Sequence, residues 1–369
     1  MNRVLTYLTI IIATTLSGCC NVNKPVQYKA EKLCGMPSIE EGYEQGVSAC
    51  YAAATSEALF IAGGCNFPDT PAAEGGKKVY YKGIYRTSTD NAGDWEMVGE
   101  LPESSAYGAN IQQGENWYIV GGMNSNGATE KAYRITLGDR PAIEMLPPLP
   151  CAIDNLSGTV MGNTLCVAGG NADGKASNRV FILELNEGKS WIELPPMPGA
   201  PRVQPVCLAT GGYIYIWGGF TPATQSHEAI VHCNGIRYGV SNGIWEELGE
   251  TSGENGTLTL SGGAAIAIND STIIAAGGVN KDIFLDAISG RYELVDKEDY
   301  MHKPVEWYKF NRELLMYNTH DNSWRTIGND TVYARAGAQL IRDGNTLYQI
   351  GGELKPGIRT PGIYRISRE

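Results

Sequence analysis

The sequence predicts an all-β fold, a six-bladed β-propeller, from three observations. Six short apolar runs each end in a pair of glycines, and successive pairs lie 48 to 74 residues apart in a chain of 369 residues. Most of these runs follow another apolar run and a tight turn, as at Asn269-Asp270 and Asp343-Gly344. A third strand-like run comes after the glycines, and a fourth carries tryptophan or ends in Leu-Pro. The pairs end at Gly64, Gly122, Gly170, Gly219, Gly278 and Gly352.

A repeat of about fifty residues, marked by a glycine pair in each copy, resembles the kelch repeat, in which each copy forms one four-stranded blade. The sixth unit stops after its third strand, GIYRISRE at 362–369. Near the N-terminus, LCGMP at 33–37 resembles the fourth-strand ending LPPMP at 194–198. We therefore expect the N-terminal strand to complete the last blade, so that residues 31–369 form a single domain without free sheet edges.

The fifth unit carries extra residues, roughly 286 to 304, which are rich in charge. Long insertions in compact folds are often functional, so this segment is interpreted as a lid or wall over the opening of the ring. The alternative is a solvated excursion without a role.

The N-terminus has the pattern of an export signal. Arg3 precedes a mostly apolar run, Val4 to Leu16, that is too short to span a bilayer comfortably. The run ends in Leu16-Ser17-Gly18-Cys19, which resembles the lipobox of bacterial lipoproteins. We expect a signal peptide at 1–18, lipidation of Cys19 and a tether at 19–30, which would anchor the protein to a membrane facing the periplasm or cell surface. The alternative is plain secretion.

Composition excludes several kinds of partner. The formal net charge of −11 argues against nucleic acid and anionic membrane surfaces. Removing Cys19 leaves eight of nine cysteines, so disulfides are allowed in an oxidising compartment. Cys166 and Cys207 lie in apolar runs and are expected to be small buried hydrophobes. The four histidines show no zinc-like grouping with cysteines, so we predict no metal site and no cofactor.

Polar residues at one mouth of the ring are the candidate site. In an antiparallel blade, the second strand ends on the face where the next blade begins, so residues after glycine pairs and residues opening the blades share that face. We expect Glu353 and Arg359 to be catalytic. The candidates for substrate binding are Arg202, Gln204, Arg335, Tyr107 and Asn66, and their neighbours on this face include Asn124, Asp154, Asn155, Asn171 and Tyr333.

Three arginines at one mouth favour a carboxylate ligand, because guanidinium groups pair bidentately with carboxylates. For each arginine taken alone, the alternative is a surface ion pair. Glu353 beside an arginine could carry protons, and its alternative is a salt bridge that only fixes the loop.

These residues also carry a family resemblance. GGVNKDIF (277–284), FNRELLMYNTHDNSW (310–324), GGELKPGIRT (351–360), APRVQ (200–204) and ELPESSAYG (100–108) resemble the N-acetylneuraminate mutarotases, or sialic acid epimerases. The blade order is rotated, as in a cyclically permuted branch. The resemblance implies interconversion of the α and β anomers of N-acetylneuraminic acid, with Glu353 and Arg359 as the catalytic pair. Arg202 and Gln204 match a family segment, whereas Arg335 is included for its position alone.

A carboxylate and a guanidinium, as at Glu353 and Arg359, are suited to opening and closing a sugar ring. Opening the sugar ring removes a proton from the anomeric hydroxyl and delivers one to the ring oxygen, and closing on the other carbonyl face gives the second anomer. On this interpretation Glu353 carries protons, while Arg359 holds the carboxylate of the sugar and polarises developing charge.

Three other functions compete with the mutarotase interpretation. A sialidase should repeat S-x-D-x-G-x-T-W boxes, and only STDNAGDW at 88–95 approaches one. A copper oxidase is disfavoured by the scarcity of histidines. A non-catalytic kelch module that binds glycans or protein stays open, because propellers host many functions.

Overall fold

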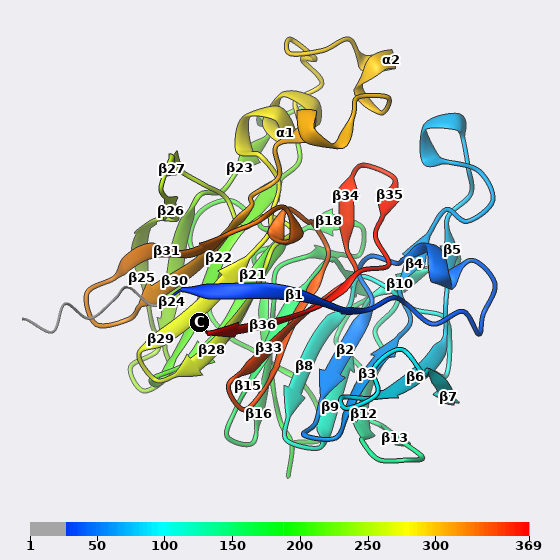
Figure 1. The fold of residues 1–369 in the computed structure, drawn as a ribbon. Coiled ribbons are helices and arrows are strands. Elements are labelled where there is room, and N and C mark those ends of the chain that lie inside the picture. Colours follow the sequence, from blue (N-terminus) through cyan, green and yellow to red (C-terminus); the bar gives the residue numbers. More distant parts are fainter. Residues whose placement is uncertain (1–26, 187, 369) are drawn as a thin grey trace, which may run out of the picture.

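The computed structural model describes residues 27–186 and 188–368. The predicted signal peptide and Cys19 lie outside the described residues. Figure 1 shows strands throughout the described chain, with helices confined to a few short segments. The prediction of an all-β fold is confirmed, and the antiparallel sheets are consistent with a propeller-like arrangement.

The described chain contains six antiparallel sheets with four principal strands each, called sheets 1 to 6 here. Sheet 1 has β2 (Tyr51–Ala54), β3 (Ala58–Ala62), β6 (Gly83–Ser88) and β7 (Glu96–Glu100). Sheet 2 has β8 (Ala109–Gln113), β9 (Asn116–Val120), β12 (Ala132–Thr136) and β13 (Ala142–Met145). Sheet 3 has β15 (Ser157–Met161), β16 (Thr164–Ala168), β19 (Val180–Glu184) and β20 (Ile192–Glu193).

The remaining three sheets follow the same plan. Sheet 4 has β21 (Val203–Thr210), β22 (Tyr213–Thr221), β24 (Asn234–Gly239) and β25 (Ile244–Glu250), with β23 (Ile230–Val231) paired to β22. Sheet 5 has β28 (Ala264–Asn269), β29 (Thr272–Ala276), β30 (Glu313–Asn318) and β31 (Ser323–Asn329). Sheet 6 has β32 (Gln339–Asp343), β33 (Thr346–Ile350), β36 (Ile363–Arg368) and β1 (Tyr28–Cys34).

Sheet 6 joins the two ends of the described chain. β1 runs antiparallel to β36, with Tyr28 opposite Arg368, and the two strands lie side by side in Figure 1. The strand begins at Tyr28, earlier than the boundary at residue 31 that the sequence suggested. Pairing the N-terminal strand with the last one covers what would otherwise be an exposed sheet edge.

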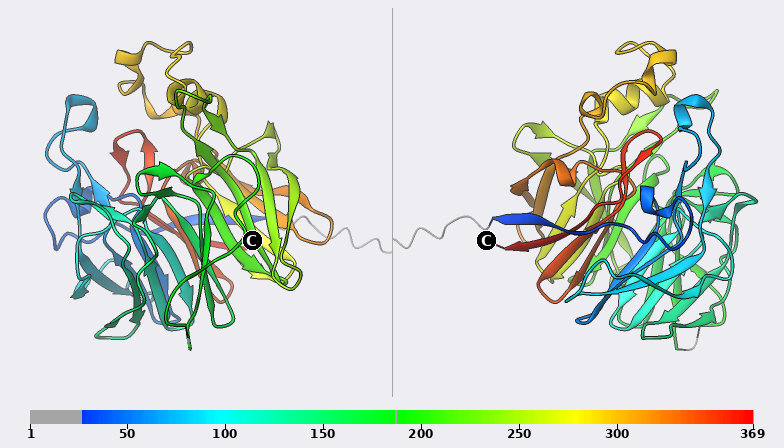
Figure 2. Two further views of the ribbon diagram at one scale, coloured as in Figure 1. Left: turned by 180° about the vertical axis from the view of Figure 1, so that it is seen from behind. Right: turned by 45° about the vertical axis from the view of Figure 1, so that its right-hand side comes forward.

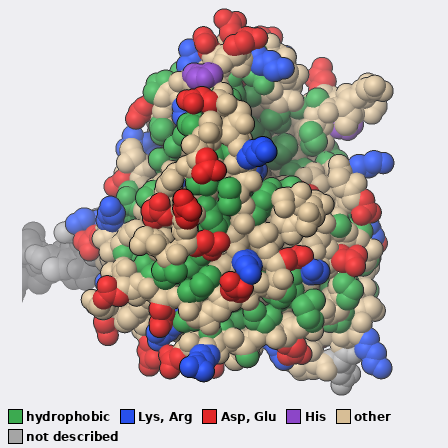
Figure 3. Space-filling model, turned by 90° about the vertical axis from the view of Figure 1, so that its right-hand side faces the viewer, with side chains coloured by type: hydrophobic (Ala, Val, Ile, Leu, Met, Phe, Trp, Pro, Cys, Tyr) green, Lys and Arg blue, Asp and Glu red, His purple; other side chains and the backbone are tan. Residues whose placement is uncertain are grey.

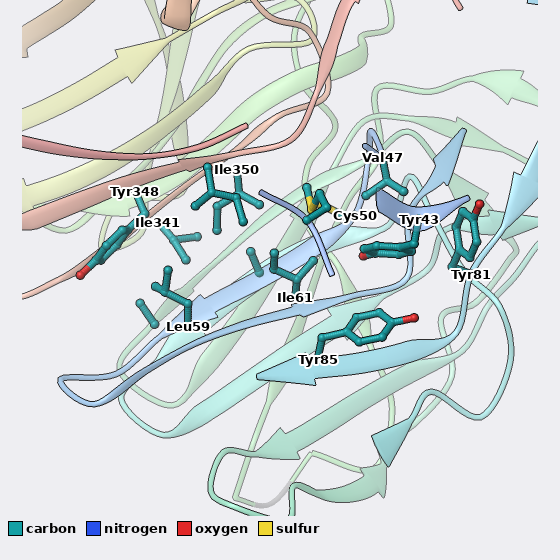
Figure 4. Packing of buried hydrophobic residues seen from close by; sticks show 14 residues of the cluster. Tyr43, Val47, Cys50, Leu59, Ile61, Tyr81, Tyr85, Ile341, Tyr348 and Ile350 are labelled. Atoms are coloured by element: carbon teal, nitrogen blue, oxygen red, sulfur yellow. The ribbon is translucent and has the colours of Figure 1, made fainter. Parts of the chain in front are cut away.

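Neighbouring sheets pack face to face through apolar side chains. Figure 4 shows the cluster between sheets 6 and 1, where Ile341, Tyr348 and Ile350 meet Leu59 and Ile61. Similar clusters lie between sheets 1 and 2, 2 and 3, 3 and 4, 4 and 5, and 5 and 6. The first strands contact one another in the order β2, β8, β15, β21, β28 and β32, and β32 contacts β2.

The glycine pairs allow close approach between sheets. Gly351 and Gly352 have φ of 60° and 98°, in the left-handed region that favours glycine. A Cβ on Gly351 would lie 2.5 Å from the carbonyl oxygen of Val47 in the segment that leads into sheet 1. The amide of Gly352 donates to that same oxygen at 2.9 Å. The pair therefore fixes the start of the next segment, Glu353 onward, against the neighbouring sheet.

Short elements complete the fold at the sheet ends. The small ladders are β4 (Cys65–Asn66) with β5 (Val79–Tyr80), β10 (Met123–Asn124) with β11 (Gly127–Ala128), β14 (Ile153–Asp154) with β17 (Asn171–Ala172) and β18 (Lys175–Ala176), β26 (Ser252–Gly253) with β27 (Gly256–Thr257), and β34 (Glu353–Lys355) with β35 (Ile358–Arg359). The helices are α1 (Lys281–Ile288), α2 (Lys297–Tyr300) and the 3₁₀ turns η1 (Tyr43–Gln45), η2 (Ala72–Glu74), η3 (Val305–Tyr308) and η4 (Thr331–Tyr333).

Candidate active site

A closed loop of backbone hydrogen bonds lies where the six first strands begin. Its members, called the mouth ring here, each have positive φ and each donate an amide proton to the carbonyl of the preceding member at 2.7–3.2 Å. The amide of Ala49 donates to Gly337, so the bonds return to their start. The members are Ala49, Tyr107, Asn155, Gln204, Gly262 and Gly337.

The two halves of the mouth ring carry different side chains. Tyr107, Asn155 and Gln204 are consecutive members, and the Nε2 of Gln204 donates to the Oδ1 of Asn155 at 2.7 Å. Gly262 and Gly337 lack side chains on the other half. A cavity of about 170 Å³ is lined by all six ring members and by Glu353. One half of the mouth is therefore polar, and the other half leaves room for a ligand.

Glu353 and Arg359 are held together by the hairpin of β34 and β35. The two residues are direct antiparallel partners. The Nη1 of Arg359 donates to the Oε1 of Glu353 at 2.7 Å, and the amide of Gly357 donates to the same oxygen at 2.6 Å. The backbone of Glu353 pairs with Ala336, directly before the ring member Gly337. Both charges are thus fixed to the mouth by backbone structure.

The arginine is the more buried partner. Only 4% of the side-chain surface of Arg359 is exposed, against 24% for Glu353. The Arg359 guanidinium also lies 5.2 Å from the ring centroid of Phe67. Burial alone would lower the pKa of Arg359, but the carboxylate of Glu353 offsets this and the pKa is raised. Arg359 therefore stays positively charged, and Glu353 presents the accessible oxygens.

Two tyrosines, Tyr107 and Tyr308, lie close enough to the ion pair to feel its charges. Burial, with a contribution from the nearby Cys65, raises the pKa of Tyr107 well above its usual range, although the charge of Arg359 opposes this. Burial likewise raises the pKa of Tyr308, and the negative charge of Glu353 adds to the effect. These hydroxyls therefore stay protonated at neutral pH, so they can donate or accept hydrogen bonds.

Two long connecting segments lie beside the β34–β35 hairpin. The loop between β4 and β5, the segment 281–308 and the β34–β35 hairpin stand at the same end of the molecule in Figures 1 and 2. The Nζ of Lys355 donates to the carbonyls of Met301 and Lys303 at 3.2 and 2.6 Å. A Cβ on Gly357 would lie 2.6 Å from the Cβ of Ala72 in the other segment. The hairpin tip is therefore flanked on both sides, and the insertion contacts it directly.

The structure places Arg202 and Arg335 away from this cavity. Arg202 donates through Nη1 to the carbonyls of Gly218 and Asn234 and through Nη2 to the Oδ1 of Asn234. Arg335 donates to the carbonyls of Gly351 and Gly362 and stacks over Tyr364. Burial lowers the pKa of both arginines to about 10. The prediction that three arginines converge on one ligand is therefore not met. Arg202 and Arg335 instead donate to backbone carbonyls within their own sheets.

Of the other residues predicted to bind substrate, two line the cavity and one does not. Tyr107 and Gln204 belong to the mouth ring and line the cavity. Asn66 is buried, where its Nδ2 donates to the carbonyls of Gly42 and Gly46 and its Oδ1 accepts from Tyr81. The polar atoms of Asn66 are thus used within the fold.

Phe67, Lys78 and Tyr80 lie beside the site, although none of them was predicted from the sequence. The Nζ of Lys78 donates to the hydroxyl of Tyr107 at 3.1 Å. These residues belong to the loop after the first glycine pair, which is unusually long and mixes aromatic and basic residues, FPDTPAAEGGKKVYY at 67–81. The length of this loop and its mixture of aromatic and basic residues were the sequence features that could have indicated a role at the site.

A second, larger cavity opens at the other end of the first strands. It has a volume of about 820 Å³ and shares Asn110, Gly158, Cys207, Ala265 and Leu340 with the mouth cavity. Its arginine, Arg342, donates to the carbonyl of Ile268. We place the candidate site at the smaller cavity because Glu353, whose carboxylate is paired with Arg359, lines it.

Across residues 27–186 and 188–368, no three His, Cys, Asp or Glu side chains gather closely enough to hold a metal ion. The cysteines in this part of the chain, Cys166 and Cys207 among them, are unpaired. No helix there is long and apolar enough to cross a membrane.

Fold and site together define the class of protein: an all-β protein of repeated four-stranded sheets, with an ion-paired carboxylate and guanidinium at a cavity where the sheets meet. The N-acetylneuraminate epimerase family matches residues 146–368, more than half of the chain. The chain belongs to this family.

Individual relatives agree with the family match at modest identity. An N-acetylneuraminate epimerase of Pasteurella multocida (strain Pm70) is 30% identical over 229 residues, covering 58% of this chain and 57% of the relative. One of Salmonella paratyphi B is 26% identical over 228 residues, covering 60% and 58%. One of Salmonella enteritidis PT4 is 27% identical over 227 residues, covering 60% and 57%. The matched region thus spans less than two thirds of each relative.

Proposed function

We propose that the protein interconverts the α and β anomers of N-acetylneuraminic acid by acid/base-assisted opening and closing of the sugar ring. The observation that carries the proposal is Glu353, whose Oε1 is fixed by Arg359 and Gly357 at the edge of the mouth cavity. Glu353 carries protons between the anomeric hydroxyl and the ring oxygen. Arg359 orients this carboxylate through their ion pair.

The energetic demand on this site is modest. Mutarotation proceeds slowly without a catalyst and consumes no oxidant or co-reactant. One positioned acid/base group contributes roughly 10²- to 10⁴-fold. A single, partly exposed carboxylate held by a buried guanidinium is therefore sufficient for this reaction.

The proposed scaffold is a single six-bladed kelch-type propeller, with sheets 1 to 6 as its blades. Its support is the cyclic order of contacts between first strands, the apolar cluster between each pair of neighbours and the closed hydrogen-bond loop of the mouth ring. The family match begins at residue 146, so sheets 1 and 2 lie outside it. A cyclic permutation of blades would produce this pattern, and a propeller tolerates permutation because blades mainly contact their neighbours.

The test is proton NMR of N-acetylneuraminic acid freshly released by a sialidase, with and without the protein. The H3 signals of the two anomers are separate, so equilibration is followed directly. We expect acceleration by the native protein and its loss in Glu353→Gln. The matched control is Glu193→Gln, which breaks the Arg179–Glu193 ion pair on sheet 3 and should leave the rate unchanged. Absence of acceleration between pH 5 and 8 contradicts the enzyme and favours a glycan-binding module.

We also propose that the protein is exported and anchored through lipid on Cys19. The support is the Leu-Ser-Gly-Cys sequence at 16–19, which lies outside the described residues. Cys19→Ser should move the protein from the membrane fraction to the soluble fraction. Unchanged fractionation of that variant contradicts the anchor.

A further inference from the structure

Lys78 is a cation held at the mouth without a counterion among the described residues. Its Nζ lies 4.9, 5.8 and 6.0 Å from the ring centroids of Tyr107, Phe67 and Tyr80. Its hydrogen bond to the Tyr107 hydroxyl uses one of three ammonium protons. In the part of the chain that the structure describes, no carboxylate lies within ion-pair distance of Lys78.

The charge of Arg359, by contrast, is already neutralised. Its Nη1 is bonded to Glu353, and 4% of its side chain is exposed. Phe67 lies beside both cations, since its centroid is 5.2 Å from the Arg359 guanidinium and 5.8 Å from the Lys78 ammonium. The mouth therefore carries one compensated basic group and one uncompensated basic group, on neighbouring surfaces.

The remaining groups near Lys78 do not supply the missing negative charge. Burial raises the pKa of Tyr80 to about 12, and burial raises that of Tyr107 also, so both phenols are neutral. The carboxylate of Asp154 is close enough to influence Tyr80, but it accepts from the side-chain amides of Asn155 and Asn171 and forms no ion pair with Lys78. Of the two basic groups at the mouth, only Lys78 is therefore left without an ion-pair partner among the described residues.

We propose that Lys78 binds the carboxylate of a monocarboxylate sugar acid at the mouth, and that this contact places the neighbouring anomeric carbon opposite Glu353. The inference rests on the proposed function and deepens it. The carboxylate role that sequence analysis gave to Arg359 passes to Lys78. The aromatic rings keep the ammonium partly desolvated, which strengthens its attraction for an anion. The Tyr107 hydroxyl lies beside the same anion site and aligns the ammonium.

The experiment is isothermal titration calorimetry, which reports binding independently of turnover. Native protein, Lys78→Met and Lys77→Met are each titrated with N-acetylneuraminic acid and with its methyl ester, which lacks the negative charge. Lys77 is the matched control because it is adjacent, exposed and chemically identical. A lost charge-assisted hydrogen bond corresponds to roughly ten- to hundredfold in affinity. We expect that loss for the acid with Lys78→Met only, and little change for the ester with any variant.

Two further results distinguish the possible failures. Lys78→Arg should keep affinity for the acid within about threefold, and rising salt should weaken binding of the acid more than the ester. Equal losses for acid and ester in Lys78→Met, or unchanged affinity for the acid, overturn the inference, as does a native protein that binds neither ligand. If native protein binds as described but does not accelerate mutarotation, the inference stands and the proposed enzyme activity fails.

Discussion

Glu353 and Arg359 face each other across a two-stranded hairpin and form an ion pair of 2.7 Å in which the arginine is buried and the carboxylate is accessible. This asymmetry separates their roles. The guanidinium is used to hold the carboxylate through Oε1, and Glu353 is the member of the pair that lines the mouth cavity. Acidic and basic side chains are interspersed on the face shown in Figure 3, so local arrangement rather than overall charge defines the site.

The arginines near the starts of the sheets should differ in role, with Arg202 needed for stability and Arg359 needed for activity. Arg202→Met leaves the carbonyls of Gly218 and Asn234 without their donor, so it should lower the free energy of unfolding by about 2–4 kcal/mol. Ligand affinity should change little.

Arg359→Met should instead lower turnover by about 10²-fold or more, because Glu353 loses its orientation. Urea denaturation and the NMR rate assay measure the two effects. A stable Arg202→Met protein without activity would return Arg202 to the site.

Lys355 should fasten the insertion to the hairpin. Lys355→Met removes both hydrogen bonds to the carbonyls of Met301 and Lys303, so amides of 297–308 should exchange with deuterium faster. The Michaelis constant should rise, since this wall of the mouth would be less ordered. Hydrogen-exchange mass spectrometry checks the first effect. Lys297→Met, an exposed change on α2, is the control, and equal exchange in both variants contradicts the tether.

Gly337 should be needed for the open half of the mouth ring. Gly337→Gln places a side chain in a left-handed conformation (φ 61°), which costs about 1 kcal/mol, and it also fills the mouth cavity. Gly344→Gln carries a similar backbone cost (φ 53°) in the turn between β32 and β33, with open space around it. Thermal melts should shift similarly for both variants, whereas ligand binding should be lost only for Gly337→Gln. Retained binding by Gly337→Gln would place the ligand elsewhere.

His232 should make stability depend on pH. Burial and the nearby charge of Arg202 lower its pKa from 6.5 to about 4. The unfolded chain therefore binds a proton below pH 6.5 that the folded protein does not accept until about pH 4. Stability should be complete at pH 7 and fall through this window, by at most about 3 kcal/mol. Urea unfolding at pH 7 and 4.5 tests this, and His232→Asn should show a smaller decrease. An identical decrease in both proteins would assign the effect to other groups.

Local patterns made much of the fold predictable. Strand runs, tight turns and glycine pairs lie within a few residues of one another, so their spacing revealed the repeated unit before any contact was known. The fourth strand of sheet 6 was also foreseeable, because its ending resembled those of other units, although β1 begins earlier than expected. Glu353 and Arg359 could be recognised for the same reason, since one short hairpin supplies both.

Sequence alone determined the all-β fold, the repeated four-stranded unit and the paired charges of one hairpin, because these depend on neighbours along the chain. The tertiary structure decided that Arg202 and Arg335 turn into their own sheets, because their partners are carbonyls 16 to 32 residues away. It also decided that Lys78, just before β5, reaches Tyr107, just before β8, across a separation of 29 residues. The direction of a side chain at the start of a sheet depends on which donors and acceptors the packed sheets leave unsatisfied, and only folding brings those groups together.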